Sequence, residues 1–219
     1  MLAVSDEVSE VLTASRLEEL DADVIASCGD LPWDYLEYLV TVTNKPLVYV
    51  PGNHDPAPRR NLSAALGIPL VPGVSSTAGR GRTGPEGCIN IDRAIVDVAG
   101  LRVAGLGGSM RYSEGPYQYT EAEMSRRSRR LQRRARVRRL RDGRGVDVLV
   151  THAPPLDLGD ERDRAHRGFG SFHGLVEVLT PKVMLHGHIH PHGRALEDRQ
   201  IGETRVLNAV GYRLVEVDA

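Results

Sequence analysis

The chain has 219 residues, 41% of them hydrophobic, which is enough for one domain with a buried core, and we expect residues 1–219 to form a single domain. A formal net charge of -1 excludes a generally basic nucleic-acid protein, and two cysteines exclude a disulfide framework. With no apolar run near ~18 residues and no signal-peptide pattern, we expect a cytoplasmic protein without membrane association.

Short valine-rich runs recur along the chain, and each ends at a polar or glycine-containing turn. Runs of this length and composition predict buried strands. They are Leu2–Val4, Val24–Cys28, Leu47–Val50, Val146–Val150 and Val183–Leu185. Apolar residues at helical spacing predict helices over Val8–Leu20 and Trp33–Thr43, so the first half alternates strand and helix. Ligands in such folds gather beyond the carboxyl ends of the strands.

Two further pairs of runs predict antiparallel hairpins, because each pair flanks a short turn. The pairs are Ala94–Val98 with Leu101–Leu106, and Arg205–Val210 with Arg213–Val217. The segment Val71–Gly87 is rich in Gly, Pro, Ser and Thr, which predicts a surface loop. His186 lies within a strand run, and we expect it to be a hydrogen-bonded core histidine.

A polar helix is expected over Glu121–Leu140, because Thr120 and Glu123 have the spacing of a capping box and Gly143 lies near its stop. Its apolar positions are sparse, and we expect a narrow buried stripe that includes Leu131, Val137 and Leu140. Arginine dominates residues 126–141, which we interpret first as a solvated cationic face, since the chain uses arginine almost throughout in place of lysine. The alternative is an electrostatic track for nucleic acid or an acidic partner.

Four polar blocks each come directly after a predicted strand. They are Gly29-Asp30, Gly52-Asn53-His54-Asp55, Thr151-His152-Ala153-Pro154 and Gly187-His188-Ile189-His190. Divalent cations take oxygen and imidazole ligands, and hydrolysis of a phosphate ester benefits from a metal that activates water and neutralises phosphoryl charge. One such block alone is more typical of a turn. The four together predict a metal centre at the strand ends.

In their order and spacing, these blocks resemble the calcineurin-like metallophosphoesterase superfamily over essentially the whole chain. The resemblance implies an α/β fold in which two mixed β-sheets pack as a sandwich flanked by helices, in four αββα layers. It also implies two metal sites bridged by one carboxylate. The bridge would be Asp30, with Asn53, His152 and His188 completing one site and Asp6 and His190 belonging to the other.

The resemblance gives two residues of the second block a catalytic role instead of a metal-binding one. His54 would lie over the scissile bond as a proton donor or charge stabiliser, and Asp55 would orient it. The loop that starts at Gly107 offers Arg111 and Tyr112 as candidate substrate-binding residues, since arginine matches phosphate oxygens with a two-pronged fork. An ordinary packed connection explains this loop equally well.

The first block departs from the family pattern of Asp, any residue, then His, because the chain has Asp6-Glu7-Val8. The first metal would keep Asp6, Asp30 and His190, with waters or Glu7 completing its shell. Losing one ligand lowers affinity without abolishing binding. We therefore favour an enzyme with two divalent ions and a labile first site over a single-metal centre.

The sequence thus predicts a metal-dependent hydrolase of phosphate esters, with a metal-bound hydroxide as the nucleophile. A phosphodiester is slightly favoured over a small phosphomonoester, because a loosened first site has little extra charge to hold a dianion. Manganese is favoured as the metal, and the same ligands accept iron and zinc. The alternative is a catalytically impaired regulatory or nucleic-acid-binding metal protein that uses the Arg-rich helix 126–141.

Overall fold

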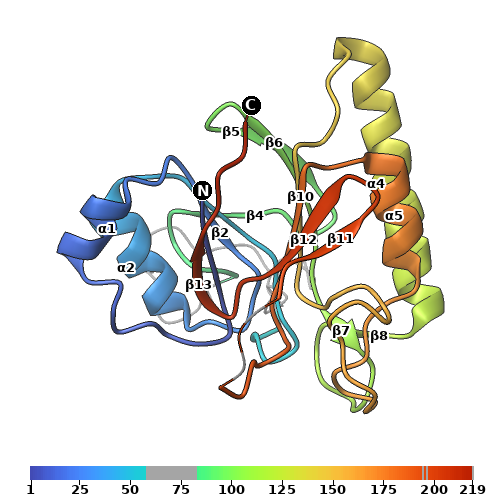
Figure 1. Ribbon diagram of the computed structural model, residues 1–219, viewed down its shortest axis with the longest axis horizontal. Helices are drawn as coiled ribbons and strands as arrows, with labels where there is room; N and C mark the ends of the chain where they lie inside the picture. Colours follow the sequence, from blue (N-terminus) through green and yellow to red (C-terminus); the bar gives the residue numbers. More distant parts are fainter. Residues whose placement is uncertain (58–82, 194, 196, 219) are drawn as a thin grey trace, which may run out of the picture.

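The structure is a computed structural model that describes residues 1–57, 83–193, 195 and 197–218. Two β-sheets face each other, with helices on their outer sides (Figure 1). Helices α1 (Ala14–Leu20) and α2 (Trp33–Thr43) cover one sheet, and α4 (Glu121–Asp142) and α5 (Ser171–Leu179) cover the other. These αββα layers confirm the expected fold class. Of the predicted loop Val71–Gly87, residues 71–82 lie outside the described part of the chain.

The first sheet has the strand order β13-β1-β2-β3-β4. Its parallel strands are β1 (Leu2–Ser5), β2 (Ile25–Ser27), β3 (Leu47–Tyr49) and β4 (Cys88–Asn90), and β13 (Gly211–Leu214) adds an antiparallel edge. Strands β1, β2 and β3 confirm three of the predicted valine-rich runs. Strand β4 was missed, because its three residues are half-buried or exposed and carry no apolar run.

The second sheet has the strand order β11-β12-β10-β9-β6-β5. Its parallel centre is β12 (Thr204–Asn208), β10 (Val183–His186), β9 (Val148–Thr151) and β6 (Leu101–Leu106), and β11 (Arg199–Ile201) and β5 (Ile95–Val98) are antiparallel edges. The first predicted hairpin is therefore confirmed as β5–β6. A separate short pair is formed by β7 (Ser109–Met110) and β8 (Gln118–Tyr119).

The second predicted hairpin is wrong. Strand β12 pairs with β10 in the second sheet, whereas β13 pairs with β1 in the first, so the chain crosses between the sheets at residues 209–210. The reason lies in the core, because Leu207, Ala209 and Val215 all point into the same apolar layer between the sheets. An apolar pattern of period two does not distinguish strands that pair from strands that face each other across a core.

Helix α1 begins later than predicted. Thr13 caps its N-terminus by accepting a hydrogen bond from the Arg16 amide. Residues 6–12, of which residues 8–12 were predicted to be helical, therefore form the loop after β1. Val8 and Val11 on this loop are 50% and 58% exposed. Their helical spacing with Leu12 and Leu17 therefore misled the sequence interpretation.

Helix α4 has the predicted capping box at Thr120 and Glu123 and the predicted stop at Gly143. Its buried stripe differs from the prediction, because Leu131 is buried while Val137 and Leu140 are 48% and 87% exposed. In the C-terminal half of α4, arginine side chains make the contacts with the rest of the fold that apolar side chains were predicted to make. Arg134 and Arg138 donate hydrogen bonds to the backbone carbonyls of Arg93 and Ile95, next to and within β5.

The C-terminal end of α4 is fastened to the β5–β6 hairpin by Arg102. This side chain is 3% exposed and binds Asp97 at 2.8 Å and Asp142 at 2.7 Å. It also donates to the carbonyl of Arg144 at 2.9 Å. The guanidinium is thus compensated by two carboxylates and a carbonyl, as a buried charge requires.

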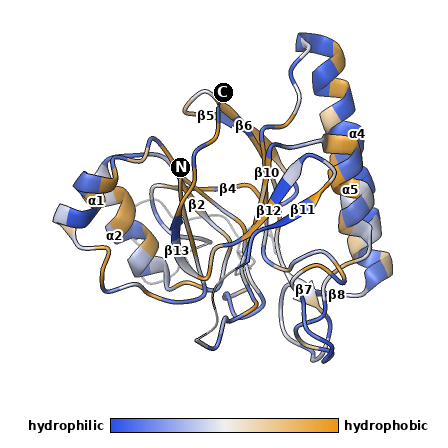
Figure 2. Ribbon diagram, in the orientation of Figure 1, coloured by the Kyte–Doolittle hydropathy of each residue, from blue (hydrophilic) through white to orange (hydrophobic). Residues whose placement is uncertain are grey.

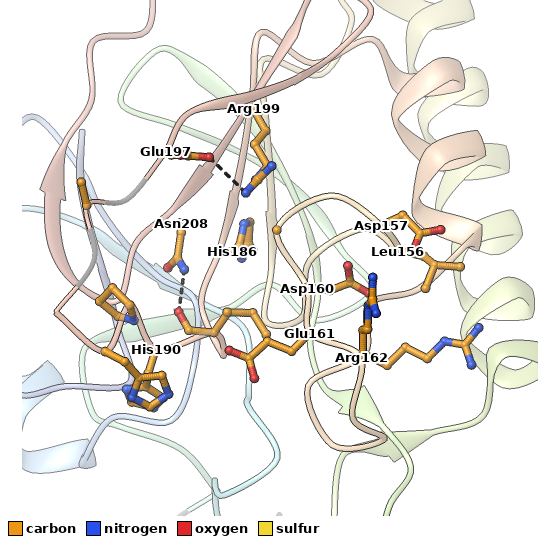
Figure 3. Close-up of a pocket in the computed structure, with 16 residues that line it drawn as sticks. Leu156, Asp157, Asp160, Glu161, Arg162, His186, His190, Glu197, Arg199 and Asn208 are labelled. Atoms are coloured by element: carbon orange, nitrogen blue, oxygen red, sulfur yellow. Dashed lines mark hydrogen bonds and ion pairs between the residues drawn. The ribbon is translucent and has the colours of Figure 1, made fainter.

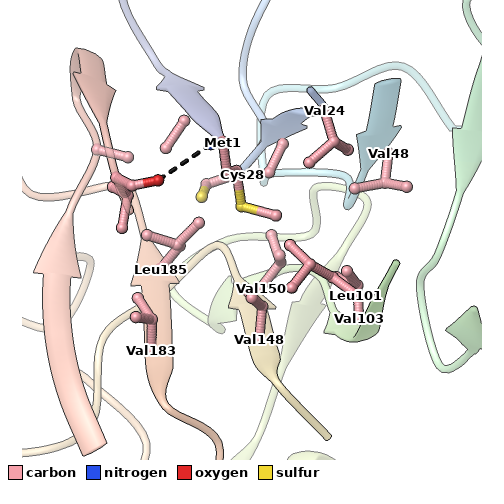
Figure 4. Packing of buried hydrophobic residues seen from close by; sticks show 14 of the residues in the cluster. Met1, Val24, Cys28, Val48, Leu101, Val103, Val148, Val150, Val183 and Leu185 are labelled. Carbon is pink, nitrogen blue, oxygen red and sulfur yellow. Dashed lines mark hydrogen bonds between the residues drawn. The ribbon is translucent and has the colours of Figure 1, made fainter. Parts of the chain in front are cut away.

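An apolar layer between the two sheets holds their strand ends at fixed positions (Figure 4). Val24 and Val48 enter it from the first sheet, and Val103, Val150 and Leu185 enter it from the second. Cys28 lies in the same layer, as expected for a small buried residue. Because the polar blocks come directly after these strands, the packed layer positions them. Of the helices described, none is long and apolar enough to cross a bilayer.

Candidate functional site

Four of the six predicted metal ligands converge at the carboxyl ends of strands from both sheets. Asp6, Asp30, His152 and His188 each offer one ligand atom, and these atoms lie within 4.8 Å of one another. The two aspartates follow β1 and β2 of the first sheet, and the two histidines follow β9 and β10 of the second. This donor set suits a divalent cation such as manganese, iron or zinc. We call these four residues the ligand cluster.

Asp30 lies at the centre of the ligand cluster, with its two oxygens in different environments. Oδ1 accepts a hydrogen bond from the backbone amide of His54 at 2.8 Å. Oδ2 lies 3.2 Å from Nε2 of His152 and has no hydrogen-bond partner among the described residues, although it is buried. Burial alone would raise the pKa of Asp30, but the charge and hydrogen bond of His152, together with the contacts from His54, outweigh burial and lower the pKa. A buried carboxylate oxygen in this state is a fitting ligand for a cation.

His152 is oriented through its far ring nitrogen. Nδ1 lies 2.8 Å from the carbonyl of Cys28, so it carries a proton and directs Nε2 toward Asp30. Burial opposes protonation of the ring, yet Asp30 raises the pKa of His152 to about 9. Nε2 also lies 2.9 Å from Oδ1 of Asn53, which is buried beside the ligand cluster. The structure therefore brings the predicted ligand Asn53 to the same point.

His188 is also oriented by a backbone carbonyl. Its Nε2 lies 2.8 Å from the carbonyl of Ala165, so Nε2 donates and Nδ1 keeps its lone pair. Its backbone amide donates to Oδ2 of Asp6 at 2.9 Å, which ties the ends of β10 and β1 together. Burial, followed by the charge of His152, lowers the pKa of His188 to about 3. The ring is neutral at pH 7, the form that binds metals.

Three ligand residues adopt left-handed backbone conformations. The φ angles of Asp6, Asp30 and His188 are 59°, 57° and 70°. Such conformations are strained for residues other than glycine, and they concentrate at functional sites. No sequence signal predicted them, because Asp and His at a strand end are equally compatible with an ordinary turn.

Two glycines of the predicted blocks allow the backbone to approach the ligands. A Cβ at Gly52 would overlap Oδ1 of Asp30, and a Cβ at Gly187 would overlap Oγ of Ser5 and Oδ2 of Asp6. Neither glycine is needed for a positive φ. Their absence of a side chain is what lets the chain pass beside the two carboxylates.

Asp55 fastens the loops after β2 and β3 to each other. Its Oδ2 accepts hydrogen bonds from the amide of Gly52 at 2.7 Å and the amide of Asp30 at 3.1 Å. Burial raises the pKa of this carboxyl to about 6. The hydrogen bonds shown for Asp55 go to the backbone, so its role in orienting the exposed ring of His54 stays a prediction.

His190, the sixth predicted ligand, lies at the rim, outside the ligand cluster. Its Nδ1 lies 2.8 Å from Oε1 of Glu7, and both side chains are partly exposed. Val8, at the position where the family pattern has histidine, is half-exposed and offers no ligand atom. The structure thus places Glu7 against His190.

The two predicted substrate-binding residues, Arg111 and Tyr112, make different contacts. Tyr112 Oη accepts a hydrogen bond from Asn53 Nδ2 at 3.1 Å, which places the phenol next to the ligand cluster. The guanidinium of Arg111 binds Glu123 at 2.9 Å and the carbonyl of Gln118 at 3.2 Å. Arg111 therefore holds its loop against the start of α4, which favours the packed-connection interpretation for this residue.

A cavity of about 740 Å³ adjoins the rim at His190 (Figure 3). Its lining includes Arg162, Arg199, Asp160 and the buried ring of His186. His186 is 2% exposed and its Nδ1 lies 3.0 Å from the carbonyl of Gly187, which confirms the expected core histidine. Burial lowers the pKa of His186 to about 4, so the ring is neutral. The cavity has the size of a small-molecule site, and no sequence pattern indicated it because its lining comes from separate loops.

Comparison with known proteins agrees with this geometry. The family model described as calcineurin-like phosphoesterase matches residues 5–192. None of the curated proteins matches the chain. One solved crystal structure is 16% identical, with a TM-score of 0.60, over 96% of this chain and 92% of the other. The crystal structure of TT1561 of Thermus thermophilus is 18% identical, with a TM-score of 0.57, over 96% of this chain and 88% of the other.

The two solved structures show a shared fold, and the family model extends over most of the chain, including all four polar blocks and the ligand cluster. The chain therefore belongs to the calcineurin-like phosphoesterase family.

Proposed function

We propose that the protein is an enzyme that hydrolyses phosphate esters, with the ligand cluster as its catalytic centre. The observation that carries this proposal is the convergence of two carboxylates and two imidazoles from both sheets, with a buried oxygen of Asp30 that has no hydrogen-bond partner among the described residues. A divalent cation held there would activate water and neutralise charge on the phosphoryl group.

The orientation of each ligand supports cation binding. Asn53, His152 and His188 would hold one cation together with Asp30, and the carbonyls of Cys28 and Ala165 already fix the two rings. Asp6 and His190 would hold the other, more labile cation at the first site, which shares Asp30. Two cations, with manganese favoured over iron and zinc, remain our proposal for the metal content.

His54 is the proposed proton donor. Its backbone amide is held by Asp30 at 2.8 Å, while its side chain is exposed beside the ligand cluster. An imidazole in this position can approach the leaving oxygen of a bound ester and protonate it as the ester bond breaks. Tyr112, next to Asn53, is the proposed contact for the substrate, and Arg111 contributes by holding the loop that carries it.

A phosphodiester remains the favoured substrate. The first block supplies no imidazole to its metal site, so the cation there is held weakly and adds little positive charge for the dianion of a monoester. The cavity of about 740 Å³ beside His190 can also hold an organic group on the ester, and a diester has two such groups.

Hydrolysis of bis(p-nitrophenyl) phosphate and p-nitrophenyl phosphate with added manganese tests the proposal. We expect manganese-dependent turnover that EDTA removes and that is faster with the diester. Asp30→Asn should abolish it, and His54→Ala should lower kcat about 10²–10⁴-fold, the usual contribution of a general acid. Glu10→Ala, a change on the exposed loop before α1, is the matched control.

No manganese-dependent turnover, or turnover that survives Asp30→Asn, would contradict the proposal. Tight manganese binding without turnover would instead favour the regulatory alternative, because the cation would then be held without chemistry.

A further inference from the structure

Helix α4 uses its arginines in two different ways on its two sides. Arg127, Arg134 and Arg138 lie on the side of buried Leu131 and contact the protein. Arg127 binds Asp92 at 2.6 Å and lies over the ring of Tyr119 at 4.1 Å. These three inner arginines hold α4 against the rest of the fold.

Four further arginines lie on the opposite side, three or four positions apart, and we call them the Arg face: Arg126, Arg129, Arg133 and Arg136. All four are exposed. Within the described residues, their side chains make no hydrogen bond or ion pair with the rest of the chain. Between Glu123 and Asp142 the helix carries no acidic residue, and Figure 2 shows α4 as hydrophilic along most of its length.

The Arg face has a cost for the isolated molecule. Like charges three and four positions apart on a helix repel one another, so the face destabilises α4 unless an anion compensates it. The chain offers no such anion among its described residues, although its net charge is -1 and acidic residues are plentiful elsewhere. An external polyanion is the complementary partner.

We propose that the Arg face binds the phosphate backbone of double-stranded nucleic acid. A guanidinium matches two phosphate oxygens at once, whereas a protein partner would require an apolar centre. The face offers only Val137 and Leu140 for such a centre, both in the C-terminal third of the helix. From Arg126 to Arg136 the Arg face extends ~15 Å along the helix axis, a length over which a duplex carries ~9 phosphates.

Fluorescence anisotropy of the full chain with a labelled 20-base-pair duplex tests this inference. EDTA is present throughout, so that the ligand cluster neither binds nor cleaves the probe through a metal. We expect a complex at 50 mM salt whose affinity falls steeply toward 200 mM, as phosphate contacts require. The triple variant Arg129→Gln, Arg133→Gln, Arg136→Gln should bind at least tenfold more weakly and show a shallower salt slope.

The matched control removes three arginines elsewhere on the surface: Arg16→Gln, Arg205→Gln and Arg213→Gln. It should bind within about twofold of the native chain, and circular dichroism should show α4 intact in both triple variants. The inference is overturned if the native chain forms no complex at 50 mM salt, or if the two triple variants bind equally. It is also overturned if polyglutamate binds the Arg face and the duplex does not, which would indicate an acidic protein partner. Because no outcome depends on ester hydrolysis, this test is independent of the proposed enzyme activity.

Discussion

His190 Nδ1 and Glu7 Oε1 lie 2.8 Å apart, although 183 positions separate the two residues in the chain. A carboxylate oxygen accepts, so Nδ1 is the donor of this contact, and Nε2 of His190 is the nitrogen left to bind a metal. Glu7 is thus placed to orient His190, a predicted metal ligand. Glu7 belongs to the first block, the one that lacks the histidine of the family pattern. Both side chains are partly exposed, so this ion pair orients the His190 ring but contributes little to the stability of the fold.

Glu7→Ala should weaken binding of the more labile manganese ion by about 10–100-fold, the usual effect of removing a partner that orients a ligand. Glu7→Gln should lose less, because its amide oxygen still accepts the Nδ1 proton. Titration of bound manganese by electron paramagnetic resonance measures both ions separately. Glu10→Ala should match the native chain, and an unchanged affinity for the more labile ion in Glu7→Ala would contradict the prediction.

Gly52→Ala should lower stability by about 1–3 kcal/mol, because the new methyl group would overlap the Asp30 carboxylate. It should also lower manganese affinity, because the new methyl group would displace both the Asp30 carboxylate and the ring of His152, whose Cε1 lies 2.8 Å from the Cβ position. Gly145→Ala is the control, since a Cβ at Gly145 meets nothing within 4 Å. Urea denaturation and manganese titration check the two effects, and equal behaviour of the two variants would show that the overlap is relieved without consequence.

Asp142→Asn should lower stability at pH 7 but lose its effect in acid. The hydrogen bond from Arg102, followed by one from the Arg144 amide, lowers the pKa of Asp142 below its ordinary value of 3.8. A lowered native pKa stabilises the fold above about pH 4, and this contribution disappears as the pH falls through the native value. Urea denaturation from pH 7 to pH 2.5 should therefore show the variant and native curves converging.

The control for this pH dependence is Asp21→Asn, which removes an exposed carboxylate 3.5 Å from Lys45. It should change stability little at any pH, because surface ion pairs contribute little. A constant difference between Asp142→Asn and the native chain across the whole pH range would contradict the assigned role of Arg102.

Tyr112→Phe should weaken manganese binding only modestly, by about fivefold. The change removes the phenol oxygen that accepts from Asn53 Nδ2, and one such hydrogen bond is worth ~1 kcal/mol. If Tyr112 also contacts substrate, KM for the diester should rise by more than manganese affinity falls. Equal changes in both quantities would limit Tyr112 to holding Asn53.

The convergence of the ligand cluster could be predicted because its residues follow directly after buried strands. Parallel strands present their carboxyl ends at one edge, so Asp30 after β2 and His152 after β9 meet once the two sheets pack together. The placement of β13 could not be predicted in this way. Alternation alone does not decide whether β13 joins β12 or the edge strand β1.

Two other features could not be predicted from the sequence, because they depend on contacts between residues far apart in the chain. The left-handed backbone of His188 depends on the contact of its amide with Asp6, which is 182 positions away. The inward direction of Arg134 and Arg138 was hidden because their partners include backbone carbonyls, which leave no complementary charge pattern in the sequence. Both depend on contacts formed only in the folded chain.

Asp6 and Asp30 extend from one sheet, and His152 and His188 extend from the other. The cation held by Asp30, His152 and His188 takes ligands from both sheets, so it would cross-link the two halves of the sandwich at the edge where these strands end. Removal of the metal by a chelator should therefore do more than stop the proposed hydrolysis. It should also let the two sheets separate at a lower temperature, so that the supply of metal governs how long the protein stays folded on heating.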